Sequence, residues 1–233
     1  MASIAACCLN LAVPAVAQTT PYVVPYVGLD ADSRHGGWSP QASDLRLAAD
    51  GKSWELISPA IYTMSDLAVV TVQELRFDAD PIVYNSTLVQ NISGLNQTYT
   101  LAISLNTTFG APNQIRGSID TSVIGLNATL ATVPGFSIYS AQIDGVTVKT
   151  LQNDVFSLST PNAAVSSSAS FGFEASNVPV NSNFGILLKF ELTPGATAAI
   201  ISDFEIAPAV PEPSTLALSI MSAGILFLRR QRR

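Results

Sequence analysis

The sequence predicts an all-β protein, with a single antiparallel domain of the β-sandwich or jelly-roll kind. Apolar and polar residues alternate through several segments, including 98–104, 184–192 and 200–206. This pattern places apolar side chains on one face of a strand. Turn-forming residues interrupt these segments at intervals of roughly 8–15 residues, without a long amphipathic helix between them. About 195 residues remain once the two terminal segments are set aside, which suits one β domain.

Residues 1–17 are expected to be a signal peptide. The segment Ile4–Val16 is mostly apolar, and small residues at Ala15 and Ala17 form a cleavage pattern that predicts a mature start at Gln18. No Lys or Arg occurs in 1–3, so either the signal starts weakly or Met1 lies inside the true signal. Residues 4–7 also resemble a lipobox, although few residues precede them.

Residues 18–52 are rich in Gly, Pro, Ser and Asp and show little periodicity. They predict a loosely structured segment that leads into the domain, with one edge strand at Tyr22–Val27. The β-sandwich domain is expected over 53–209. Within it, the β-branched run at Val69–Val72 favours a strand over a helix.

The dipeptide Asp144-Gly145 predicts a tight hairpin between the segments Phe136–Ile143 and Val146–Leu151. Asp-Gly is favoured in two-residue hairpin loops because both positions can take positive φ.

Residues 210–233 form three consecutive parts, each with its own chemistry. The prolines keep Val210–Pro213 extended, Ser214-Thr215 can cap a helix, and Leu216–Leu228 contains only apolar or small residues. The chain closes on Arg229, Arg230, Arg232 and Arg233. The apolar run is shorter than the roughly 20 residues of a full span, but the arginines can reach the headgroups and lengthen it. We therefore expect a short transmembrane helix with a cytoplasmic basic stop.

The motif Pro211, Glu212, Pro213, the apolar run and the terminal arginines together resemble the PEP-CTERM sorting signal. The resemblance implies processing by an exosortase, a membrane cysteine protease of exopolysaccharide-producing Gram-negative bacteria. It also implies a precursor anchored in the inner membrane and a final place at the cell surface or in the extracellular matrix. Residues 75–104 are similar to a segment that recurs in such proteins.

Composition excludes several kinds of site. Both cysteines, Cys7 and Cys8, lie in the expected signal peptide, so no disulfide, thiolate nucleophile or Cys-zinc site is expected in the mature chain. Four of the 11 basic residues lie in the tail, which leaves seven against 17 acidic residues, a net charge of −10. Such a surface repels nucleic acid.

The single histidine, His35, limits catalytic options. A multi-histidine metal centre is excluded, and a Ser–His–Asp triad would have to use His35 without a Gly-x-Ser-x-Gly elbow. No phosphate-binding loop or redox motif is present, so the chain is not expected to be an enzyme.

Two carboxylate pairs are the candidate metal ligands: Asp30 with Asp32, and Asp78 with Asp80. Their oxygens could converge on Ca²⁺, although neither segment completes an EF-hand loop. Alternatively, they cap turns, or one pair serves a glycosidase. No other cofactor is expected.

Five Asn-x-Ser/Thr sequons occur, at Asn85, Asn91, Asn96, Asn106 and Asn127. In a bacterial chain this rich in Asn and Thr, chance and turn preference explain most of them, rather than glycosylation.

Taken together, the sequence predicts an exported protein that is structural or adhesive in an exopolysaccharide or biofilm matrix. The alternatives are a carbohydrate- or Ca²⁺-binding module and a secreted hydrolase.

Overall fold

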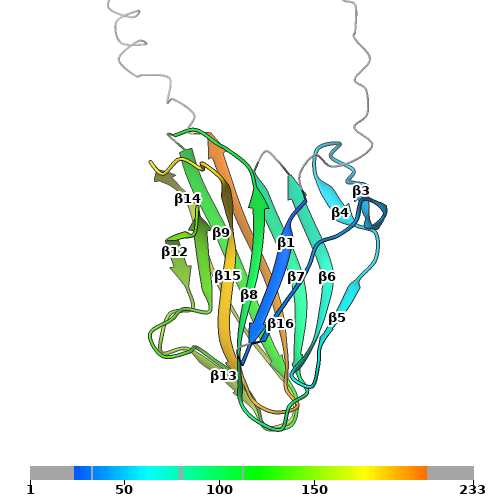
Figure 1. The fold of residues 1–233 in the computed structure, drawn as a ribbon. Coiled ribbons are helices and arrows are strands. Elements are labelled where there is room, and N and C mark those ends of the chain that lie inside the picture. The colour runs from blue at the N-terminus through cyan, green and yellow to red at the C-terminus, as the bar shows by residue number, and fades with distance from the viewer. Residues whose placement is uncertain (1–23, 33, 79–80, 112, 209–233) are drawn as a thin grey trace, which may run out of the picture.

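A computed structural model describes residues 24–32, 34–78, 81–111 and 113–208. They form two antiparallel sheets that pack face to face (Figure 1), so the predicted all-β, antiparallel class is confirmed. The expected signal peptide and sorting signal lie outside these residues. Within the described ranges, no helix is long and apolar enough to cross a membrane.

The two sheets, called A and B here, have eight strands each. Sheet A has the spatial order β12 (Val146–Leu151), β11 (Tyr139–Ile143), β15 (Asn183–Leu192), β8 (Gln97–Asn106), β1 (Tyr26–Ala31) and β2 (Arg34–Trp38), with β10 (Ala128–Ala131) on β15 and β13 (Ser157–Thr160) on β10. Sheet B has the order β14 (Ala164–Ser176), β9 (Asn113–Ile124), β16 (Thr197–Pro208), β7 (Ile82–Asn91), β6 (Ala68–Asp78), β4 (Trp54–Leu56) and β3 (Leu45–Leu47), with β5 (Ala60–Met64) on β6. A single 3-10 turn, η1 (Ala42–Asp44), precedes β3.

The core lies between the sheets and follows the predicted alternation. In β15, every second side chain from Phe184 to Leu192 is buried, and the same holds for β16 from Ile200 to Ile206. The rings of Phe184 and Phe204 pack across the two layers with their centroids 5.8 Å apart. This aromatic contact adds to the burial of apolar surface that holds the layers together.

Residues 18–52 do not form the predicted loose segment, at least in the part that the structure describes. Strand β1 pairs with both β8 and β2, so it lies inside sheet A and not at an edge. Its side chains at Val27, Leu29 and Ala31 are buried, while Gly28 and Asp30 between them face outwards. Among the described residues, the β domain therefore already includes β1 from Tyr26, well before the predicted boundary at residue 53.

The predicted hairpin at Asp144-Gly145 is confirmed. The two residues have φ angles of 51° and 76°, and they join β11 to β12. Strand β11 starts at Tyr139, three residues later than the apolar segment suggested. The predicted strand through Val69–Val72 is also confirmed, because it forms part of β6.

Candidate functional site

A continuous line of outward-facing side chains crosses the exposed face of sheet B. Cross-strand pairing places one residue from each of seven strands in this line, which we call the polar row: Arg46 (β3), Glu55 (β4), Arg76 (β6), Tyr84 (β7), Asp203 (β16), Ser118 (β9) and Ser170 (β14). Neighbouring strands lie roughly 4.8 Å apart, so the row spans about 29 Å.

These side chains face outwards because the strands alternate. Tyr84, for example, lies between the fully buried Val83 and Asn85, and Ser118 precedes the buried Ile119. A second line of residues runs beside the polar row and is also mostly polar, although its Ser86 is buried: Glu74, Ser86, Ile201, Asp120 and Ser168. The face therefore offers hydroxyl, carboxylate and guanidinium groups over most of its width.

Hydrogen bonds hold several of these groups in place. Arg46 Nε donates to Glu55 Oε1 at 2.8 Å, and the Tyr84 hydroxyl donates to Glu74 Oε2 at 3.2 Å. Burial raises the pKa of the Tyr84 phenol, and the Glu74 carboxylate adds to that rise. The phenol thus stays protonated and remains a donor at neutral pH.

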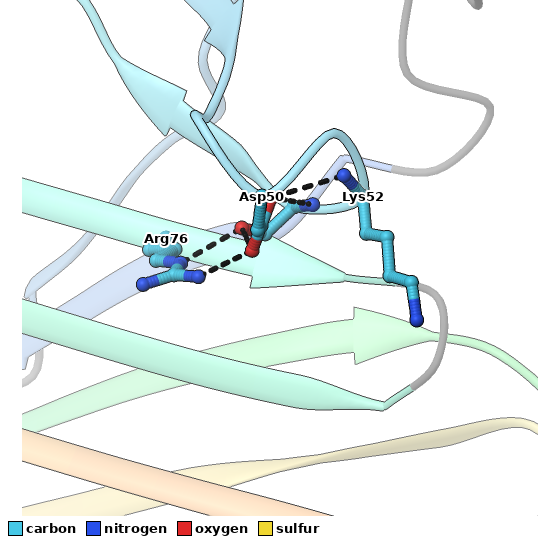
Figure 2. A network of polar contacts seen from close by, with 4 residues as sticks. Asp50, Lys52 and Arg76 are labelled. Atoms are coloured by element: carbon cyan, nitrogen blue, oxygen red, sulfur yellow. Dashed lines mark hydrogen bonds and ion pairs between the residues drawn. The ribbon is translucent and has the colours of Figure 1, made fainter.

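The loop between β3 and β4 fixes Arg76. Figure 2 shows the Arg76 side chain reaching from β6 to the Asp50 carboxylate in this loop, with a distance of 2.5 Å between Nη2 and Oδ2. Asp50 also accepts hydrogen bonds from the Ser53 hydroxyl and the Lys52 amide. These hydrogen bonds, led by that of Ser53, hold the pKa of Asp50 below its usual range. The guanidinium is therefore anchored near one end of the polar row, two strands in from Arg46.

A groove of about 440 Å³ opens at this end of the row. Its lining combines apolar and charged side chains: Arg46, Glu55, Leu56, Glu74, Leu75, Arg76, Ile82 and Tyr84. A β-bulge after Val72 turns Glu74 towards the solvent beside Tyr84. Five of the eight lining residues are charged or polar, so the groove can hydrogen-bond to a ligand as well as contact its apolar parts.

A second hollow lies at the other end of the row, over β9 and β14. It is lined by Ser118, Asp120, Ser168, Ala169 and Ser170. The Ser118 hydroxyl donates to the Asp203 carboxylate. Both ends of the row are thus concave and polar, which suits a ligand that extends across the strands.

The carboxylate pairs expected from the sequence lie elsewhere. Asp30 is on the outer face of β1, where its carboxylate is 2.7 Å from Nδ1 of His35 on β2. Asp32 follows at the end of β1, whereas Asp78 ends β6 in the other sheet, and Asp80 lies outside the described residues. In the described part of the chain, no group of three or more His, Cys, Asp or Glu could hold a metal ion.

Two of the five sequon asparagines are buried. Asn85 donates to the Ser202 hydroxyl at 2.8 Å, and Asn91 donates to the Leu192 carbonyl at 2.8 Å. A glycan at either position cannot be accommodated in the folded domain. Asn96, Asn106 and Asn127 are exposed.

Sequence reasoning did not find the polar row, because its residues are scattered from Arg46 to Asp203 and meet only through the strand order. The available signal was weaker: Tyr84 and Ser118 each occupy the outward position of an alternating segment.

Comparison with known proteins adds no relative, since neither a protein-family model nor a curated protein matches the chain.

Proposed function

We propose that this chain is an exported protein that adheres to extracellular polysaccharide through the polar row of sheet B. The observation that carries the adhesive part is the row itself, with a groove at one end and a hollow at the other. A row of about 29 Å could contact several consecutive sugars of an extended polymer. The protein would thus act as a structural or adhesive component of an exopolysaccharide matrix.

The chemistry of the row favours a sugar polymer over a polyanion. Its two arginines, Arg46 and Arg76, are each paired with a carboxylate, so the face is not a basic patch. Carboxylates, hydroxyls and guanidinium groups can all hydrogen-bond to sugar hydroxyls, and the ring of Tyr84 can pack against a sugar face. Nucleic acid would meet an acidic molecule with a net charge of −6.

Export and sorting rest on the terminal segments. The Pro211-Glu212-Pro213 motif, the apolar run and the terminal arginines support handling by an exosortase after translocation. On this proposal, the inner membrane holds the precursor until the tail is cleaved. The domain then reaches the cell surface or the matrix.

The adhesive proposal predicts that Tyr84→Ala weakens binding to exopolysaccharide isolated from a producing host. We expect a dissociation constant roughly tenfold higher, because losing one aromatic contact costs on the order of 1.5 kcal/mol. Co-sedimentation of the processed protein with the polymer would measure the change.

The matched control is Tyr26→Ala, since Tyr26 is an exposed tyrosine on β1 of the opposite sheet. Equal loss of binding in both variants, or no binding by the unaltered protein, would refute the adhesive proposal. Release of reducing sugar from the polymer would instead indicate a hydrolase that uses the groove carboxylates Glu55 and Glu74.

The sorting proposal predicts two forms of the protein in a host that has its exosortase. The cell-bound precursor should retain Arg233, and the released form should have lost the segment after the Pro-Glu-Pro motif. Deleting the exosortase should leave only the precursor. Intact-mass measurement of both fractions tests this, and the same spectra locate the N-terminus relative to Gln18. Release of unshortened protein in both strains would contradict the proposal.

A further inference from the structure

Strand β14 is a long sheet edge. It contains 13 residues, Ala164–Ser176, and pairs only with β9. The other single-partner strands among the described residues, β2, β3, β5, β12 and β13, have three to six residues each. Folded proteins usually keep edge strands short, because unpaired backbone groups at an edge can pair with another strand.

The usual protection is missing along most of β14. Residues 164–173 contain neither a charged residue nor a proline, whereas the edge strands β2, β3 and β12 carry Arg34, Arg46 and Lys149. The only charge on β14 is Glu174, which lies past a bulge and forms a 2.7 Å ion pair with Lys149 of β12. The part of the edge without charge is therefore the stretch before the bulge, where no second strand pairs and the Gln152 side chain donates to the Ser167 carbonyl.

The neutral stretch suits a second copy of this chain. The chain has a net charge of −6, so two copies repel each other least where they meet along an uncharged strand. An antiparallel pairing with a two-fold axis at Ser168 brings Ser166 opposite Ser170 of the second copy on the outer face. On the inner face, the same register brings Val165 opposite Phe171.

In each of these cross-strand pairs, the two side chains that face each other are compatible. A serine hydroxyl both donates and accepts, so serine can pair with serine across the axis. Aromatic side chains opposite β-branched ones are among the favourable pairs in antiparallel sheets. We propose that two copies of this chain associate through β14, so that sheet B continues from one protomer into the other.

The first test places like charges at the axis. Ser168 is exposed, and Ser168→Lys would set two lysines opposite each other in the dimer. We expect dimerisation of the full-length chain to weaken by about tenfold or more, measured by sedimentation velocity over a concentration series. The matched control is Ser122→Lys, which adds the same charge to the same face one strand further in, on β9. It should leave the dimer intact.

The second test does not depend on a charge being tolerated. With Cys7 and Cys8 changed to Ser, Ser168→Cys should form a covalent dimer under mild oxidation, because the two thiols would face each other across the axis. Ser122→Cys should remain monomeric on a non-reducing gel. Circular dichroism verifies the fold of each variant.

Three results would overturn the proposal. The unaltered chain could remain monomeric at all concentrations, Ser168→Lys could dimerise as well as Ser122→Lys, or the two cysteine variants could cross-link equally. The last two would indicate association through another surface, including the C-terminal segment.

Discussion

At the scale of single residues, Asp144 has two structural tasks. It adopts the positive φ of the β11–β12 turn, and its carboxylate also accepts hydrogen bonds from the loop that precedes β15. The amides of Asn181, Ser182 and Asn183 donate at 2.9, 2.8 and 3.1 Å. These backbone hydrogen bonds, led by that of Asn181, hold the pKa of Asp144 below its usual range.

Replacing Asp144 with Asn should lower the melting temperature at neutral pH, because Asn keeps the turn but loses the charged acceptor. The carboxylate has a lower pKa in the folded state than its unfolded value of about 3.9. Its contribution to the stability of the folded state is thus complete above that value and is lost as the pH falls through the folded pKa. The difference in melting temperature between wild type and Asp144→Asn should be constant from about pH 7 to 5 and should shrink below about pH 4. Thermal unfolding over a pH series measures it.

Asp32→Asn is the matched control. Asp32 also has a positive φ, of 44°, and its carboxylate has no hydrogen bond within the described residues. Its substitution should change the melting temperature little at any pH. If the difference in melting temperature between wild type and Asp144→Asn persists unchanged into strong acid, the role assigned to the carboxylate is contradicted.

At this scale, the sequence predicted the turn at Asp144-Gly145 but not the distant hydrogen-bond partners of Asp144 and Asn85. The Asp-Gly turn was predictable because φ preference is a local property of those two residues. The second task of Asp144 was not, since the amides that donate to its carboxylate lie 37 to 39 residues away. The burial of Asn85 was also hidden, because its hydrogen-bond partner Ser202 is 117 residues away.

At the scale of elements, one glycine allows β15 and β8 to lie close together. Gly185 of β15 lies opposite Ser104 of β8. A Cβ at Gly185 would be 2.1 Å from the Ile103 carbonyl oxygen. Because that atom belongs to the backbone, the clash cannot be relieved by rotating a side chain.

We therefore expect Gly185→Ala to lower the free energy of unfolding by roughly 3 kcal/mol or to prevent folding. The matched control is Gly172→Ala in β14, where a Cβ would meet no atom within 4 Å. Urea denaturation of both variants gives the comparison. Comparable stability of Gly185→Ala and Gly172→Ala would mean that the two strands can separate without cost.

The strands that the sequence predicted best are those with strict alternation, such as β15 and β16. Strand β2 was missed because its Gly36-Gly37 pair has low strand propensity. In the fold, the Tyr26 ring covers Gly37 and the Tyr62 hydroxyl lies against Gly36, so tyrosines fill the space that side chains would occupy. Neither tyrosine is a sequence neighbour of the glycine that it covers.

At the scale of the whole molecule, the fold class was predictable and the candidate site was not. Alternation and turn spacing are local patterns, and they suffice to predict an all-β domain. The polar row depends on strand order: Tyr84 and Asp203 are adjacent only because β16 inserts between β7 and β9. Periodicity contains no information about which strands become neighbours.

The place of β16 in sheet B has a mechanical consequence. Tension on the chain beyond Pro208 would pull along β16, which has ladder partners on both sides, β9 from Asn113 to Ile124 and β7 from Ile82 to Gln90. Antiparallel hydrogen bonds lie perpendicular to the strands, so such a pull would shear them together instead of opening them one after another. A domain held by its C-terminal end while its outer face binds a polymer would therefore bear the load along a strand that is paired on both sides (Figure 1).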